Sequence, residues 1–334
     1  SQAGQTLSFT VQADDGNGGT VSSETLFFDV SDDFAVVEAG LLPVVYGSSS
    51  SLGDVNGDGN LDLVITGEDA NDNRTATLYL GDGDGGFTDS DAGLTGVNYG
   101  SSSLGDVDGD GNLDLVITGE DANDNRTATL YLGDGDGGFT DAEAGLRGVS
   151  FSSSSLGDVN GDGHLDLVIT GLGFGLSGPT ATLYLGDGDG GFTDAQAGLT
   201  GVRSGSSSLG DVNGDGALDL VITGFGMNVF GNPDETARLY LGDGDGGFTD
   251  ADAGLVRVQR GSSSLGDVDG DGSLDLVVTG WSGSSNVAML YLNDGSGGFT
   301  NAEAGLPGAV GRSSLGDFNG DGTLDLVGSS APGL

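Results

Sequence analysis

The chain has 334 residues, no Cys and a formal net charge of −44, because 52 Asp and Glu residues stand against only 8 basic residues. The absence of Cys excludes disulfide stabilisation, and the large negative charge argues against nucleic-acid binding. No apolar run of about eighteen residues occurs, which argues against insertion into a membrane.

The acidic composition leaves two habitats open. Such a charge often indicates disorder, but regular apolar runs recur along the whole chain and predict a folded protein. Screening in high salt would relieve the self-repulsion, so a halophilic protein is one interpretation, and an acidic secreted calcium protein of an ordinary habitat is the other. Ser1 opens without a basic and apolar leader, so we expect any signal peptide to lie upstream or to have been removed.

The first expected element is a strand over roughly Leu7–Gln12, followed by the Gly-rich turn 14–19. This strand could end an upstream module, pair with the edge of a neighbouring molecule, or fray. We therefore expect residues 1–24 to form an N-terminal extra strand or linker and residues 25–334 to form the main domain.

The next element is the segment Asp54–Asp62, which reads D-x-N-x-D-G-x-x-D. Carboxylates at alternate positions of a loop can converge on one hard cation, and Ca²⁺ takes six to eight oxygen ligands. We expect side-chain ligands at loop positions 1, 3, 5 and 9, a backbone carbonyl at position 7, and a sharp turn at the Gly of position 6.

The loop recurs six times, which predicts about six Ca²⁺ ions. The expected metal-site residues are Asp54, Asn56, Asp58, Asn60 and Asp62; Asp106, Asp108, Asp110, Asn112 and Asp114; Asp158, Asn160, Asp162, His164 and Asp166; Asp211, Asn213, Asp215, Ala217 and Asp219; Asp267, Asp269, Asp271, Ser273 and Asp275; and Asp317, Asn319, Asp321, Thr323 and Asp325. An acidic Gly-rich turn without metal is the alternative.

These loops differ from EF-hands, which need a bidentate Glu at position 12 and a helix on each side. Position 12 is Ile65 in the first loop, and the flanking residues are β-branched and apolar, so the loop belongs in a β-hairpin. Weak calcium loops suit the millimolar calcium outside cells, which predicts an extracellular, cell-surface protein.

The loops return at spacings of 52, 52, 53, 56 and 50 residues, and each full unit contains four short apolar segments joined by Gly-rich turns. Four-stranded units at this period predict blades of a β-propeller. The Ser- and Gly-rich first segment suits the crowded innermost strand, although a disordered serine tract is the alternative. Residues 67–89 and 119–141 are identical, which indicates recent duplication.

The last unit stops after its second strand, at Leu326-Val327. Residues 25–28 and 34–41 look like the third and fourth strands of a unit, and 34–41 has the same Ala-Gly-Leu ending as the other units. We predict that they close the ring with residues 308–327. The predicted fold is an all-β, six-bladed β-propeller, with a seven-bladed one as the alternative.

Units reading Gly-Asp-Val-Asn-Gly-Asp-Gly-x-Leu-Asp-Leu-Val, followed by Leu-Tyr-Leu-Gly-Asp-Gly-Asp-Gly-Gly-Phe, resemble FG-GAP/VCBS repeats. Such repeats build integrin α-subunit propellers and many large microbial surface proteins. The resemblance covers roughly residues 25–334, and it implies a propeller, calcium on the loop between strands one and two, and a role in adhesion or surface assembly. Integrin propellers have seven blades and calcium in only some, whereas this chain has six complete loops.

In a propeller of this kind the calcium loops and the Gly-Asp-Gly-Asp-Gly-Gly turns share one face. Asp82 and Asp84 of those turns, and their copies, either bind further calcium or are solvated. The loops on the opposite face vary: Glu68–Arg74, Glu120–Arg126, Leu172–Pro179, Phe225–Thr236 and Trp281–Val287.

The variable loops contain two kinds of candidate residue. Their apolar residues could contact a partner or could pack locally; they are Phe174, Phe225, Met227, Phe230 and Trp281. Asn73 and Asn125 match the N-glycosylation pattern, which also arises by chance.

Three functions remain open. The first is a non-enzymatic calcium-binding surface protein for adhesion or self-assembly into a filament, with copies of itself, other surface proteins or glycans as partners. The second is a carbohydrate-binding propeller, which would need an aromatic and polar pocket on every blade. The third is a polysaccharide hydrolase or lyase, which would need an acidic cluster unique to one blade, and the sequence shows none.

Overall fold

The computed structural model describes residues 7–11, 24–28, 41, 44, 46–174, 178–227, 233–309, 311–318 and 320–328. Within these ranges every regular element is a β-strand, so the predicted all-β class is confirmed. The part of the chain described here contains no helix with the length and hydrophobicity needed to cross a bilayer.

Five repeated units each contain four antiparallel strands in sequence order, as the repeat predicts. Unit 1 has β3 (Tyr46–Gly53), β4 (Asp62–Glu68), β5 (Arg74–Gly81) and β6 (Phe87–Asp89). Unit 2 has β7 (Asn98–Gly105), β8 (Asp114–Glu120), β9 (Arg126–Gly133) and β10 (Phe139–Asp141). Unit 3 has β11 (Ser150–Gly157), β12 (Asp166–Leu172), β13 (Pro179–Gly186) and β14 (Phe192–Asp194).

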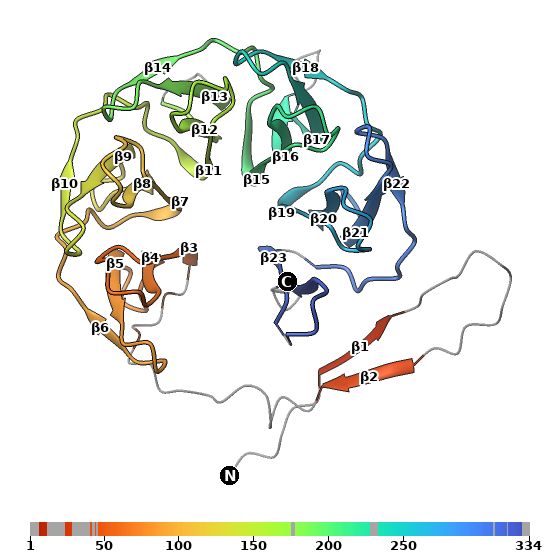
Figure 1. Ribbon diagram of the computed structural model, residues 1–334, viewed down its shortest axis with the longest axis horizontal. Coiled ribbons are helices and arrows are strands. Elements are labelled where there is room, and N and C mark those ends of the chain that lie inside the picture. Colours follow the sequence, from red (N-terminus) through yellow and green to blue (C-terminus); the bar gives the residue numbers. More distant parts are fainter. Residues whose placement is uncertain are drawn as a thin grey trace, which may run out of the picture.

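Units 4 and 5 repeat the pattern, and the last sheet is shorter. Unit 4 has β15 (Val202–Gly210), β16 (Asp219–Met227), β17 (Pro233–Gly242) and β18 (Phe248–Asp250). Unit 5 has β19 (Gln259–Gly266), β20 (Asp275–Trp281), β21 (Asn286–Asn293) and β22 (Phe299–Asn301). The last sheet has β23 (Ser313–Gly316) and β24 (Asp325–Gly328). Figure 1 shows these sheets side by side around a common axis, with the first strand of each innermost.

The inner strands of neighbouring units are joined by serine side chains. Ser51 Oγ lies 2.8 Å from Ser102 Oγ and donates to the Ser102 carbonyl at 2.9 Å. The equivalent hydroxyl pairs follow around the axis at 2.7–2.8 Å: Ser103–Ser154, Ser155–Ser207 and Ser208–Ser263. The Ser-rich segments are therefore ordered inner strands, and their hydroxyls link one unit to the next.

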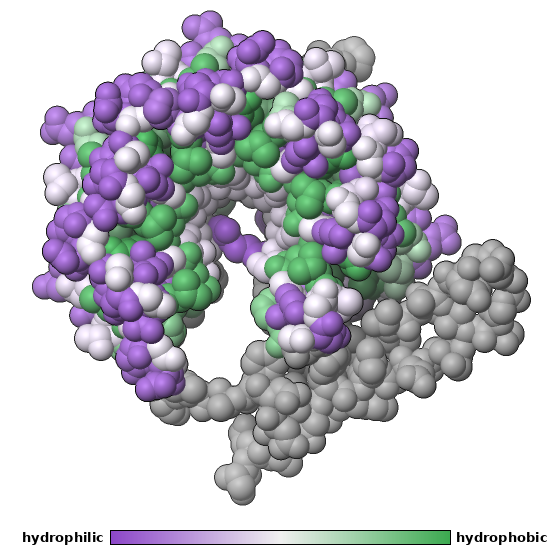
Figure 2. All heavy atoms as spheres, in the orientation of Figure 1, coloured by the Kyte–Doolittle hydropathy of each residue, from purple (hydrophilic) through white to green (hydrophobic). Residues whose placement is uncertain are grey.

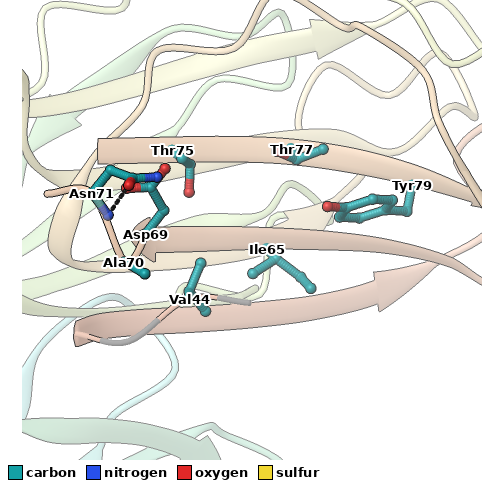
Figure 3. A pocket seen from close by; sticks show the side chains of 8 residues that line it. All are labelled: Val44, Ile65, Asp69, Ala70, Asn71, Thr75, Thr77 and Tyr79. Carbon is teal, nitrogen blue, oxygen red and sulfur yellow. Dashed lines mark hydrogen bonds between the residues drawn. The ribbon is translucent and has the colours of Figure 1, made fainter. Parts of the chain in front are cut away.

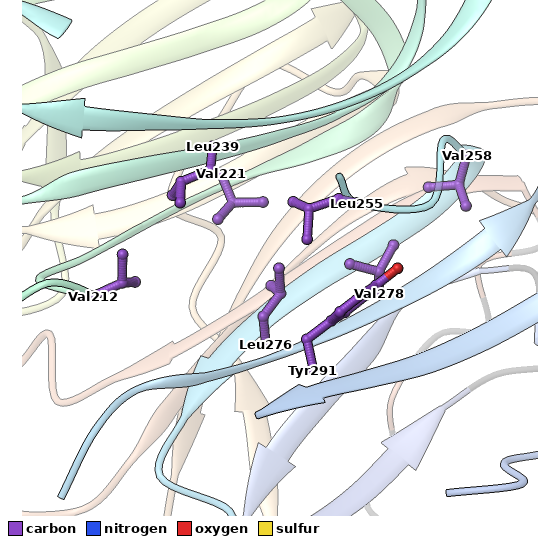
Figure 4. Packing of buried hydrophobic residues seen from close by; sticks show 8 residues of the cluster. All are labelled: Val212, Val221, Leu239, Leu255, Val258, Leu276, Val278 and Tyr291. Atoms are coloured by element: carbon purple, nitrogen blue, oxygen red, sulfur yellow. The ribbon is translucent and has the colours of Figure 1, made fainter. Parts of the chain in front are cut away.

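The hydrophobic core lies between units rather than within one sheet. Figure 4 shows the cluster between units 4 and 5, in which Val221 and Leu239 of unit 4 face Leu276, Val278 and Tyr291 of unit 5. Equivalent clusters lie between units 1 and 2, 2 and 3, and 3 and 4. Close approach requires a glycine at the end of the inner strand in units 1–5: a Cβ on Gly53, for example, would lie 2.7 Å from Leu113 Cδ1 of unit 2.

The side of unit 1 that faces the last sheet forms no such cluster among the described residues, and we call it the open seam. Leu52 and Leu61 of unit 1 are 59% and 60% exposed, and Phe318 and Val327 of the last sheet are 45% and 54% exposed. On the face shown in Figure 2, an opening between unit 1 and the last sheet reaches the centre of the molecule.

The N-terminal strands differ from the prediction. β1 (Leu7–Val11) pairs with β2 (Glu24–Phe28), with Leu7 opposite Phe28. The prediction that residues 25–28 pair with 308–327 is therefore wrong in this structure, because a nearby partner across the Gly-rich segment 14–19 costs less loop-closure entropy than one about 300 residues away. Segment 34–40, also predicted to close the ring, lies outside the described residues.

Candidate metal centres

Each acidic loop lies in the turn between the first and second strands of its unit. In unit 1 the loop begins after β3 and ends at Asp62, the first residue of β4. Gly59 at position 6 has a φ of 90°, which other residues rarely adopt, and this permits the tight turn. The strands thus hold the two ends of the loop together and bring its carboxylates to one edge of the sheet.

The carboxylate at position 1 folds each loop on itself. Asp54 Oδ1 accepts the N–H of Asp58 at 3.1 Å, and Oδ2 accepts the N–H of Gly59 at 2.9 Å. In unit 3, Asp158 accepts the N–H groups of Asp162 and Gly163 in the same way. Position 1 therefore points into the loop, as a ligand at this position should.

The carboxylate at position 9 connects the loop to the outer turn of the same unit. Asp62 is buried, and its two oxygens accept the N–H groups of Val55 at 2.8 Å and Gly81 at 2.9 Å. Burial raises the pKa of the equivalent Asp114, Asp166 and Asp219, since their charge is desolvated. The sequence predicted these residues as ligands but missed this structural role, which the repeated Gly at the start of most outer turns could have suggested.

Among the residues that the structure describes, two loops bring three carboxylates together. In unit 2, carboxylate oxygens of Asp106, Asp108 and Asp114 lie within 4.8 Å of one another, and in unit 5 the same holds for Asp267, Asp269 and Asp275. Both loops have Asp at position 3, where the other loops have Asn. In units 1, 3 and 4 the Asn amide instead donates to the carboxylate at position 5, as from Asn56 to Asp58 at 3.1 Å.

These residues fit a hard divalent cation. Three like charges at short range repel one another unless a cation lies between them. Asp106 Oδ1 is buried and accepts no hydrogen bond from the described residues. An oxygen desolvated in this way and left without a donor is suited to a metal ligand, and carboxylate oxygens are the ligands that Ca²⁺ prefers.

Positions 5 and 7 do not join the carboxylate clusters. Asp58 is exposed, and its Oδ1 accepts the N–H of Asn60 at 2.8 Å. The side chain at position 7 lies against the outer turn: a Cβ on Gly188 would be 2.1 Å from His164 Nδ1. In the last sheet Asp325 is half-buried and accepts the N–H of Phe318 at 3.0 Å, while Asn319 lies outside the described residues.

The remaining acidic and glycosylation candidates lie in exposed turns. Asp82 Oδ1 accepts the N–H groups of Asp84 and Gly86, so this carboxylate caps its own turn. Asn73 and Asn125 are exposed, and each donates its side-chain amide to an aspartate of the same loop. Their glycosylation stays a prediction.

Three of the apolar candidates on the variable face are exposed. Phe174 is 60% exposed, Met227 51% and Trp281 37%. Phe225 is half-buried, with the Arg203 guanidinium 5.2 Å from the centre of its ring, so it packs locally. Phe230 lies outside the described residues.

Comparison with known families and structures gives one extended match. The profile described as "FG-GAP-like repeat" matches residues 54–117, 106–169, 158–222 and 267–328, and each match begins at the first Asp of an acidic loop. A search of curated protein sequences finds no match.

Several solved structures share features with this chain at low identity. The biofilm matrix protein Bap1 of V. cholerae is 18% identical with a TM-score of 0.41; the match covers 81% of this chain and 41% of Bap1, so the chain spans less than half of that protein. A point mutant of the Aleuria aurantia lectin in complex with α-methyl-L-fucoside is 12% identical with a TM-score of 0.48, covering 86% of this chain and 88% of the lectin. The Trypanosoma rangeli sialidase with sialic acid is 13% identical with a TM-score of 0.40, covering 97% of this chain and 58% of the sialidase.

Proposed function

Because the chain belongs to the FG-GAP-like repeat family, we propose that it is a non-enzymatic, calcium-binding extracellular module for adhesion or self-assembly. The observation that carries the proposal is the cluster of Asp106, Asp108 and Asp114, with its buried, unpartnered oxygen. Calcium there would neutralise the clustered carboxylates and hold the loop against the first two strands of the unit.

Calcium in all six loops completes the metal part of the proposal. In each loop positions 1, 3 and 9 would supply the inner oxygens, with positions 5 and 7 contributing from the rim. Position 1 already folds the loop and position 9 already holds it to the outer turn, so an ion would stabilise the folded unit. Six ions would offset about twelve negative charges, because each carries two.

A closed ring of six blades is the second part of the proposal. It is supported by the residue types of the open seam, since Leu52 and Leu61 correspond to Leu104 and Leu113, which pack into the cluster between units 1 and 2. The outer strand of the sixth blade would come from residues 34–41, because Phe34 precedes Ala39-Gly40-Leu41 at the same spacing as Phe139 precedes Ala144-Gly145-Leu146.

The third part is the division of the chain and the location of its contacts. The predicted boundary between residues 24 and 25 falls inside the β1–β2 hairpin, so we propose that the ring begins after Phe28 and that residues 1–28 form an N-terminal segment. The hairpin would then be an assembly strand or the end of an upstream module. Phe174, Met227 and Trp281 on the variable face are the proposed partner contacts.

Catalysis is not proposed, because the buried carboxylates at position 9 are engaged with backbone N–H groups in units 1–5. A hydrolase or lyase needs a carboxylate pair free to exchange protons with substrate.

Calorimetric titration and electron microscopy test the proposal together. We expect calcium to bind the metal-stripped protein at about six sites, and ordered filaments or sheets to form in millimolar calcium and to be lost with a chelator. Failure to bind calcium would overturn the metal part. Isolated particles at every calcium concentration, with no binding to cells or glycans, would overturn the adhesion and assembly part.

A further inference from the structure

Units 1 and 3 each have a small cavity at the same place, beneath the segment that enters the unit. In unit 1 the cavity has about 150 Å³ and is lined by Val44, Ile65, Thr75, Thr77 and Tyr79, together with the loop 69–71. Figure 3 shows Thr75, Thr77 and Tyr79 in a row on β5, facing Ile65 and Val44.

The cavity in unit 3 keeps this frame and is larger, at about 220 Å³. Its wall repeats the frame with Val149, Ile169, Thr180, Thr182 and Tyr184. At roughly 30 Å³ per water it holds about seven waters, which is space for one sugar ring and too little for a drug-sized ligand.

Two residues distinguish the cavity of unit 3, and both are specific to that unit. Arg147 stands where units 2, 4 and 5 have Thr95, Thr200 and Val256. Phe174 comes from the variable loop, at a place where the unit 1 cavity has Ala70 and Asn71. Because the frame recurs in more than one unit, we take it as part of the fold. Arg147 and Phe174 are the residues that could make a ligand bind unit 3 and not the other units.

Hydrogen bonds hold the backbone at Arg147 and next to Phe174. The N–H of Arg147 donates to the Tyr184 hydroxyl at 3.2 Å, as Thr95 does to Tyr131 at 3.1 Å, so the backbone position is common to the units and only the side chain changes. The loop that carries Phe174 is closed by Gly173 N–H donating to the Gly178 carbonyl at 3.1 Å, and Arg126 of unit 2 also donates to the Gly173 carbonyl.

The lining groups are a cation, an aromatic ring and hydroxyls. Arg147 is exposed, and the chain has only 8 Lys and Arg residues against 52 acidic ones. Its guanidinium is therefore one of few cationic groups that an anion could bind. Burial raises the pKa of the Tyr184 hydroxyl, and the Arg147 backbone N–H that donates to this hydroxyl opposes that rise. Phe174 offers an exposed ring face. Thr180 and Thr182 add hydroxyls, and Thr180 offers its oxygen as an acceptor because it donates its proton to the Gly171 carbonyl at 3.2 Å.

We propose that the unit 3 cavity binds a carboxylate-bearing sugar, such as the uronic acid residue of an acidic glycan. Arg147 pairs with the sugar carboxylate, because a guanidinium presents two parallel N–H groups to such a group. The apolar face of the pyranose ring packs on Phe174. The threonine and tyrosine hydroxyls hydrogen-bond the sugar hydroxyls.

This inference rests on the adhesion part of the proposed function, for which it names a glycan ligand, but it needs neither calcium in the loops nor self-assembly. It also differs from a lectin with one site on every blade. The unit 1 cavity, which has the frame without Arg147 and Phe174, serves as an internal comparison.

Ligand-observed NMR titration of the intact chain in millimolar calcium tests the proposal, with glucuronic acid and glucose as a pair that differs only at the carboxylate. We expect saturable binding of glucuronic acid and at least about tenfold weaker binding of glucose. Arg147→Thr, which introduces the residue of unit 2, and Phe174→Ala should each weaken glucuronic acid binding about tenfold. If the natural ligand is a sugar within or at the end of a glycan chain, a glucuronate oligosaccharide should also bind, and its binding should depend on the same residues.

Arg260→Ser is the matched control. It removes the same charge from unit 5, and Ser204 occupies the equivalent position of unit 4 with a φ of 52°, close to the 54° of Arg260, so the change is compatible with the backbone. We expect less than about a twofold effect on binding. Three outcomes would overturn the proposal. Equal binding of glucose would mean that the carboxylate is not recognised, undiminished binding by Arg147→Thr would mean that Arg147 does not hold it, and the same loss in Arg260→Ser would point to general charge attraction.

Discussion

The seam between units 1 and 2 and the open seam of unit 1 contain the same residue types in two different environments. Leu115 of unit 2 is fully buried against unit 1, whereas the equivalent Leu63 of unit 1 is only half-buried. Leu113 packs into the cluster between units 1 and 2, whereas its equivalent Leu61 is 60% exposed. The comparison teaches that a unit of this fold does not bury its own apolar face: each sheet depends on the next for its core.

Of the changes considered, removing calcium should lower the stability of the units and their seams most. We expect a chelator to lower the melting temperature by about 10 °C or more, because each ion that binds only the folded state adds to stability. Differential scanning calorimetry with and without chelator measures the effect, and added magnesium controls for ionic strength. An unchanged melting temperature would mean that the loops hold the units together without metal.

The carboxylate at position 9 has more hydrogen bonds in an interior unit than in the last sheet. Asp114 accepts backbone N–H groups from Val107, Asp108 and Gly133, whereas Asp325 accepts one from Phe318 within the described residues. We expect Asp114→Asn to cost about 2–3 kcal/mol of unfolding free energy and Asp325→Asn less than about 1 kcal/mol. Urea denaturation at saturating calcium measures both, and equal costs would show that Asp325 is as fully engaged in solution as Asp114.

A pair of leucine variants tests whether the open seam is closed in solution. Leu113→Ala should cost about 1–2 kcal/mol, since the side chain is partly buried against Gly53. With the proposed six-bladed ring, Leu61→Ala should cost the same, because Leu61 would pack on Gly316. If Leu61→Ala is neutral in denaturation experiments while Leu113→Ala destabilises, the seam is open and the closure proposal fails.

Exchanging the residue at position 3 gives the smallest expected effect. Asp108→Asn should weaken calcium binding in unit 2 about tenfold, and Asn56→Asp should strengthen it in unit 1 by a similar factor, because affinity rises with the number of charged ligands. Calcium titration followed by NMR of the loop glycine amides separates the two sites. A change of the same sign in both variants would contradict the assignment of position 3 as a ligand.

The sequence predicted the repeated parts of the fold because local and long-range signals agree there. Alternation of Gly-rich turns with segments such as Leu113–Thr118 predicted the strands, and the structure has β8 at Asp114–Glu120. The N-terminal prediction failed for residues 25–28. These residues resemble the third strand of a unit, but they also have a possible hairpin partner nearby, and the sequence alone does not show which pairing is favoured.

The candidate site was only partly predictable from sequence. Spacing identified the loops, but the difference between Asp and Asn at position 3 decided where carboxylates gather, as at Asp108 against Asn56. The pocket of unit 3 could not be foreseen, because Arg147 and Phe174 are separated by 27 positions and meet only through the fold.

The serine hydroxyls that join the inner strands have an evolutionary consequence. Each strand presents the same small groups to both neighbours, so one unit can adjoin any other without a change of contacts, as the pairs Ser51–Ser102 and Ser155–Ser207 illustrate. Recombination between near-identical coding segments, such as those for 67–89 and 119–141, could therefore exchange whole units while preserving every junction. The variable loops can then diverge in one unit at a time, because exchange of units leaves the contacts between inner strands unchanged.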